Sequence, residues 1–84
     1  MTALEIINKW CEMAESKNLP EHKIHFWRIR DMLENKFEVD KTLAILAWLF
    51  LIKICKPSPE RGILITEVRN YMVLKNYPQE EKIG

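Results

Sequence analysis

Two cysteines and two histidines are the side chains of this sequence best suited to nucleophilic chemistry. Cys11 or Cys55 could attack a substrate, with His22 or His25 as the base. Each cysteine falls on an apolar helical face, however, where a thiol usually packs without reacting and nothing nearby is arranged to lower its pKa. The sequence also has no glycine-rich loop to hold a phosphate. We therefore expect a protein that is not an enzyme.

The two histidines could instead bind a metal ion, and the two cysteines could form a disulfide. His22 and His25 are three residues apart, but a zinc site needs three or four protein ligands, and no further cluster supplies them. One cysteine pair without a secretion signal is more typical of two buried thiols in a reducing compartment. We expect no metal, no cofactor and a cytoplasmic location.

The region around Trp27 is more informative. Ile24 and Trp27 are three residues apart on a predicted helix and point away from its apolar face. A tryptophan among charged side chains on a polar face is typical of a protein-binding hot spot. The residues expected to bind a partner protein are Lys23, Ile24, Trp27, Arg28, Arg30 and Asp31. The alternative is that another helix of the same chain covers Ile24 and Trp27.

A nucleic-acid partner is an alternative of a different class. The C-terminal half could form a helix-turn-helix-like unit, with side chains available for contacts at Arg61, Thr66, Arg69 and Asn70. Residues 62–65, where base contacts would be made, are Gly-Ile-Leu-Ile and offer little to base edges. The formal net charge of +1 is also far below that of a general polyanion binder. Nucleic acid is therefore not the favoured partner.

Four helices are expected to position these side chains. Thr2 and Glu5 fit a capping box at the start of a first helix that should end near Asn18. Pro20 suits the first position of a second helix that should run to residue 35 or 36.

The second half of the chain carries similar signals. Asp40 fits the cap of a third helix, over residues 40–56, and Ser58 the cap of a fourth that should run to about residue 76. Residues 43–52 are ten apolar residues in a row, fewer than the roughly 20 that span a membrane. The sequence thus predicts the all-α class. We expect a compact four-helix domain, residues 1–76, packed around a central hydrophobic third helix, with residues 77–84 as a flexible tail.

The amount of apolar surface predicts an interaction partner. The chain has 84 residues, of which 48% are hydrophobic, and domains of this size bury a smaller share of their surface than large ones. The apolar stripes exceed what one central helix can cover, which favours self-association or a partner protein. We interpret the protein as a non-enzymatic helical interaction module, an adaptor or inhibitor acting as a homo-oligomer. The alternative is a small nucleic-acid-binding regulator.

Overall fold

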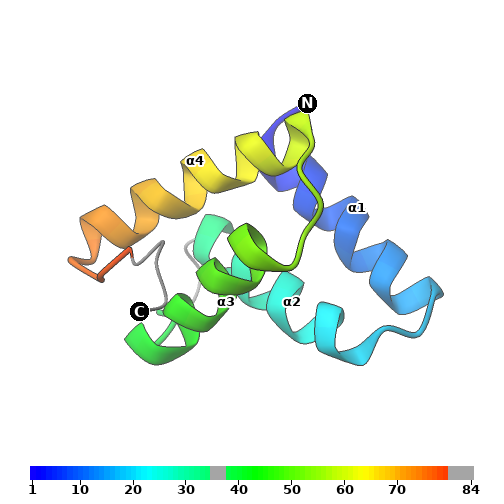
Figure 1. The fold of residues 1–84 in the computed structure, drawn as a ribbon, viewed down its shortest axis with the longest axis horizontal. Coiled ribbons are helices and arrows are strands. Elements are labelled where there is room, and N and C mark those ends of the chain that lie inside the picture. Colours follow the sequence, from blue (N-terminus) through cyan, green and yellow to red (C-terminus); the bar gives the residue numbers. More distant parts are fainter. Residues whose placement is uncertain (35–37, 80–84) are drawn as a thin grey trace.

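The computed structural model describes residues 1–34 and 38–79, and these form four helices without a strand. Their order and arrangement are visible in Figure 1. The helices are α1 (Ala3–Ser16), α2 (Pro20–Glu34), α3 (Lys41–Lys53) and α4 (Pro59–Leu74). The predicted all-α class and the number of helices in this part of the chain are confirmed.

The predicted caps start the helices. The Thr2 hydroxyl accepts a hydrogen bond from the Glu5 backbone N–H at 3.2 Å, and the Glu5 carboxylate accepts one from the Thr2 N–H at 3.2 Å. This reciprocal pair is the expected capping box. The Asp40 carboxylate accepts from the Thr42 N–H at 3.1 Å, and Ser58 caps the first turn of α4 in the same way. Local side chains thus satisfy backbone donors that each helix start leaves unpaired.

Two helices end at an asparagine in the left-handed conformation. Asn18 follows α1 with φ of 54°, and Asn76 follows α4 with φ of 60°. In each case the next residue, Leu19 or Tyr77, donates its N–H to a carbonyl in the last turn of the helix, at 2.9 and 2.8 Å respectively. Asparagine tolerates this conformation better than most residues. Each turn directs an apolar side chain back onto the core.

The core lies between the helices and includes residues from all four. Its largest fully buried side chain is that of Trp48 on α3. Both α2 and α4 pack against all three other helices, whereas α3 packs against α2 and α4 and makes no backbone contact with α1. The expected central position of the third helix is therefore not confirmed. In Figure 1, α3 passes in front of α2, and its outward side faces the viewer.

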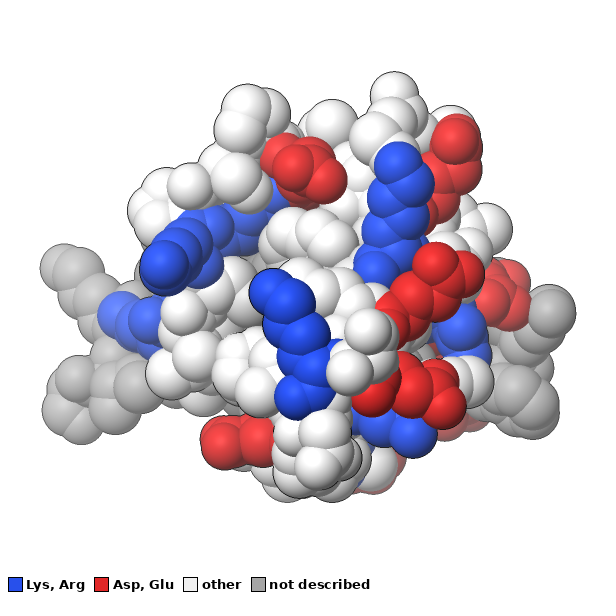
Figure 2. Space-filling model, turned by 90° about the vertical axis from the view of Figure 1, so that its right-hand side faces the viewer, with Lys and Arg blue, Asp and Glu red and all other residues white. Residues whose placement is uncertain are grey.

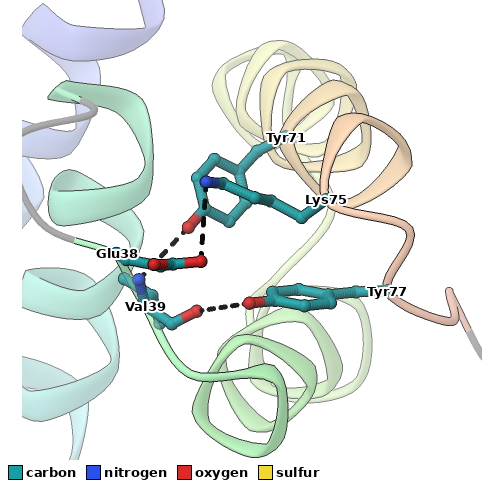
Figure 3. Close-up of polar contacts among 5 residues, drawn as sticks. All are labelled: Glu38, Val39, Tyr71, Lys75 and Tyr77. Atoms are coloured by element: carbon teal, nitrogen blue, oxygen red, sulfur yellow. Dashed lines mark hydrogen bonds and ion pairs between the residues drawn. The ribbon is translucent and has the colours of Figure 1, made fainter.

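A pair of tyrosines anchors the connection between α2 and α3. Val39 is buried in this connection; its backbone N–H donates to the Tyr71 hydroxyl at 3.2 Å, and its carbonyl accepts from the Tyr77 hydroxyl at 3.1 Å. Figure 3 shows Tyr71 on α4 and Tyr77 on the segment after it reaching Val39, next to an ion pair of 3.7 Å between Lys75 and Glu38. The buried backbone groups of Val39 therefore have partners in place of water.

This anchoring includes the expected first residue of the tail. Tyr77 packs against the core and bonds to Val39. The rest of that tail, residues 80–84, and the expected end of the second helix at residue 35 or 36 lie outside the described residues. Within the described ranges, no helix is long and apolar enough to cross a membrane.

Candidate functional site

The outward side of α2 carries two large apolar side chains. Ile24 is 51% exposed and Trp27 is 39% exposed, although Phe26 and Ile29, on the inward side of the same helix, are buried. The alternative in which another helix covers Ile24 and Trp27 is therefore wrong. We call the six residues predicted from the sequence the Trp27 surface: Lys23, Ile24, Trp27, Arg28, Arg30 and Asp31.

Arg30 holds the indole ring of Trp27 in place. The guanidinium carbon of Arg30 lies 3.4 Å from the ring centroid of Trp27, close enough for a cation–π contact. The same guanidinium forms an ion pair of 3.5 Å with Glu34 and donates to the Asn8 side-chain oxygen on α1 at 3.3 Å. The contacts with Glu34 and Asn8 therefore hold the guanidinium against the indole ring.

The charged residues of the Trp27 surface lie on two edges of α2. Lys23 and Arg30 face α1, where Lys23 is 3.9 Å from the carboxylate of Glu15. That pair is exposed and contributes little to stability. Arg28 projects about 160° around the helix from Arg30, and its charge adds to the burial that lowers the pKa of His25. Asp31 follows Trp27 by one turn and is half-buried. Ile24 and Trp27 are therefore bordered by charges on both sides.

The two histidines pack against Phe50 of α3. The His25 ring stacks on the Phe50 ring with centroids 4.3 Å apart, and the His22 ring meets it edge-on at 5.0 Å. Burial lowers the pKa of His25, and the Arg28 charge adds to this effect. The Nδ1 atom of His25 is buried without a hydrogen-bond partner. No three His, Cys, Asp or Glu side chains in the described part of the chain come close enough to share a metal ion.

The two cysteines are free thiols. Cys11 is buried in the core and Cys55 is half-buried near the end of α3. Burial raises the pKa of Cys11, and it raises the pKa of Cys55 to about 11 despite the nearby Arg61 charge. Both side chains are therefore thiols rather than thiolates at neutral pH, and the thiolate is the nucleophilic form.

The residues proposed for nucleic-acid contacts do not share one surface. Arg61 and Arg69 line a groove of about 270 Å³ between α3 and α4, together with Lys53. Asn70 lines a different groove, of about 410 Å³, between α2 and α4. The Thr66 hydroxyl donates to a backbone carbonyl of its own helix at 3.1 Å. Figure 2 shows one face of the molecule, on which basic and acidic side chains alternate with uncharged ones over much of the surface.

The partners that order the Trp27 surface were only partly visible in the sequence. Glu34 is four residues after Arg30, a spacing at which opposite charges pair on a helix. Asn8 and Glu15 belong to α1, and no local pattern connects them to Arg30 or Lys23. Tertiary packing of α1 on α2 supplies these two contacts.

Comparison with known proteins leaves the geometry of the Trp27 surface as the main guide to function. The features of this surface that bear on function are an outward indole ring, an arginine whose guanidinium contacts the ring, and a border of charges. No protein-family model matches the chain, and no curated protein or solved structure matches it either.

Proposed function

We propose that this protein is a non-enzymatic helical interaction module, an adaptor or inhibitor that acts as a homo-oligomer and binds a partner protein through the Trp27 surface. The observation that carries the proposal is the outward position of Trp27 together with its ordering by Arg30. Tryptophan and arginine are the residues most often found where binding energy concentrates.

The composition of the surface indicates the kind of partner. The Trp27 ring and Ile24 offer apolar area that a shallow apolar pocket could bury. Lys23, Arg28 and Asp31 surround that area with both signs of charge. Such a border contributes more to orientation and specificity than to affinity. We therefore expect a folded protein partner with its own mixed charges, rather than a polyanion.

Two further observations support a role without catalysis. The raised pKa values of Cys11 and Cys55 keep both thiols protonated. Ser58 uses its hydroxyl to accept the Arg61 N–H at 3.1 Å as a helix cap. Free thiols are also typical of a reducing compartment, which supports the proposed cytoplasmic location.

The direct test is a pull-down from a lysate of the source organism with the immobilised chain, read by mass spectrometry. The wild type and Trp27→Ala are compared, and Leu74→Ala is the control because Leu74 is an 85% exposed apolar side chain on a different helix, α4. We expect a discrete protein that wild type and control retain and that Trp27→Ala loses, with or without nuclease. Equal retention by all three chains would contradict the proposal.

A second candidate function is binding of nucleic acid through the C-terminal half. The observation that favours it is the groove in which Lys53, Arg61 and Arg69 border Ile52 and Ile65. Arg61 is held there by donating to the Cys55 carbonyl at 3.0 Å, and the Arg69 guanidinium lies 5.5 Å from the Trp48 ring centroid. The groove could receive backbone phosphates.

Binding of nucleic acid predicts a different response to salt and to substitution than binding of a partner protein does. Affinity for duplex DNA or RNA should fall steeply with salt and should drop in Arg61→Ala, but Trp27→Ala should leave it unchanged. Salt-insensitive or undetectable binding would exclude it.

A further inference from the structure

The outward side of α3 has the composition of a helix interface rather than of a solvated surface. Leu46 is 45% exposed and Leu43 is 37% exposed, and Leu49 is partly exposed beside them. Only α2 and α4 contact α3 among the described elements. A surface helix normally has polar residues on the side away from the core. The outward side of α3 therefore lacks a cover within the described chain.

The residues on this side form one continuous stripe. We call Thr42, Leu46, Leu49 and Lys53 the α3 stripe. Their spacings of four, three and four residues place them along a single line on the helix, as in the contact seam of a coiled coil. The two leucines occupy the middle of the stripe, and the two polar residues occupy its ends.

We propose that the α3 stripe is the contact surface of a homodimer, in which α3 packs antiparallel against α3 of a second copy about a two-fold axis. The proposal names the surface for the homo-oligomeric part of the proposed function, on which it rests, and it does not depend on the Trp27 surface. A two-fold interface requires one patch that complements itself. With the axis between Leu46 and Leu49, each of these leucines meets the other in the second copy, and Thr42 meets Lys53.

Charge complementarity selects the antiparallel direction and a second copy as the occupant. The acidic side chains near the start of α3 are Asp40 and Glu38, the second of which already pairs with Lys75 of α4, and the basic side chains near its end are Lys53 and Lys56. Antiparallel packing brings each acidic end next to a basic end, and it also opposes the two helix dipoles. Lys41 projects about 100° around the helix from Thr42, away from the stripe.

The size of the contact between the two copies of α3 sets the expected strength of the dimer. The 13 residues of α3 span about 20 Å, so a contact between two such helices lies at the small end of specific protein interfaces. We therefore expect a reversible dimer with a dissociation constant on the order of 10 μM.

The first experiment is analytical ultracentrifugation of the full chain over roughly 5 to 500 μM, a range that brackets the expected dissociation constant. The wild type should shift from its monomer mass of 10.1 kDa toward twice that value. Leu46→Glu should remain a monomer throughout, because it places two buried carboxylates in the seam. Leu74→Glu is the matched control and should still dimerise. A wild type that stays monomeric, or a Leu46→Glu chain that dimerises like the control, would overturn the proposal.

Circular dichroism checks that Leu46→Glu keeps its helices. If it does not, Leu46→Gln replaces it with the same expected result, at least a tenfold weaker dimer. Trp27→Ala should dimerise like the wild type, which separates failure of this proposal from failure of partner binding.

A second variant tests the direction of packing. Lys53→Ala removes a favourable contact with the acidic end of the other copy in the antiparallel arrangement, so the dimer should weaken severalfold. In a parallel arrangement the two Lys53 side chains would face each other, and the same substitution would tighten the dimer. Tightening would therefore overturn the antiparallel proposal.

Discussion

The outward sides of α2 and α3 both carry large apolar side chains, but the surroundings of these side chains differ. On α2, the Trp27 ring is bordered by charged residues and lies 3.4 Å from the guanidinium carbon of Arg30. On α3, Leu46 and Leu49 form the middle of a stripe whose polar residues stand only at its ends. The surface on α2 is a single ordered aromatic side chain among charged residues, and the surface on α3 is a continuous stripe of apolar side chains.

Under the two proposals above, this difference corresponds to two kinds of recognition on one small domain. A tryptophan with charges of both signs around it favours a different protein, since the arrangement of charge can distinguish partners. A self-complementary leucine stripe favours a second copy of the same chain. The two surfaces lie on different helices, so single substitutions can test them separately.

The largest expected effect is on the free energy of unfolding, and it distinguishes the inward side of α3 from its outward side. Trp48→Ala should lower the free energy of unfolding by about 3–5 kcal/mol, because the ring is fully buried and its removal leaves a cavity. Leu46→Ala should lower it by about 1 kcal/mol or less when measured at a concentration where the chain is monomeric. Urea denaturation followed by circular dichroism gives both values. Similar losses would show that the outward side belongs to the core.

The next effect concerns the Val39 connection, which sets how α3 lies on α2. Tyr71→Phe leaves the buried Val39 N–H without its acceptor and should lower the free energy of unfolding by about 1–3 kcal/mol. Tyr77→Phe removes a donor to the partly buried Val39 carbonyl and should lower it by about 0.5–1.5 kcal/mol. The test compares the urea concentrations at the midpoints of unfolding, with the slope of the unfolding free energy against urea the same in each chain. A larger loss for Tyr77→Phe would contradict the described anchoring.

A smaller, pH-dependent effect is expected where α2 meets α3. The pKa of His25 in the folded protein is below its ordinary value of 6.5, so the unfolded chain takes up this proton more readily. The stability that depends on neutral His25 is therefore complete above pH 6.5 and decreases as the pH falls through 6.5 toward the folded pKa.

His25→Phe should keep the ring contact with Phe50 and remove this dependence. Unfolding free energies of both chains at roughly pH 7.5 and 5.5 test this, and the gap between variant and wild type should widen in favour of the variant at the lower pH. A gap that stays constant would contradict the described environment of His25.

The smallest effect on stability is expected for Arg30→Ala, but this variant should change the order of Trp27. We expect a loss of about 1 kcal/mol or less, since the removed contacts are only partly buried and the ion pair with Glu34 is long at 3.5 Å. In protein labelled with 5-fluorotryptophan, the fluorine resonance of Trp27 should shift and sharpen, while that of Trp48 stays in place. Arg28→Ala is the matched control and should leave the Trp27 resonance unchanged. An unshifted Trp27 resonance in Arg30→Ala would mean that Arg30 does not order the ring.

The sequence predicts the helix starts well because their signals are local, whereas α3 ends at Lys53, before the expected residue 56. Thr2, Asp40 and Ser58 cap helices as expected, since a cap requires only a side chain and a backbone N–H a few residues away. Asn18 ends α1 by a conformation that depends on its own residue type. The contact of Tyr77 with Val39 has no local signal, because the two residues are 38 positions apart in the sequence.

Orientation could be predicted for α2 but not for α3. On α2, polar and apolar residues separate around the helix, and that pattern predicts Ile24 and Trp27 on the side away from its apolar face. It leaves open whether another helix covers them, and the structure shows both exposed. On α3, nearly every position is apolar, so the sequence contains no angular information about which side is buried. Apolar residues on all sides of α3 predict a central position for this helix, but Leu46 and Leu43 are exposed in the structure.

Partner binding through the Trp27 surface requires that the fold does not need the Trp27 side chain. The most direct test compares the neighbouring substitutions Phe26→Ala and Trp27→Ala by urea denaturation, because Phe26 is only 2% exposed and Trp27 is 39% exposed. We predict that Phe26→Ala lowers the free energy of unfolding by about 3–5 kcal/mol and Trp27→Ala by about 1 kcal/mol or less. Comparable losses for the two variants would contradict the account and assign Trp27 to the core.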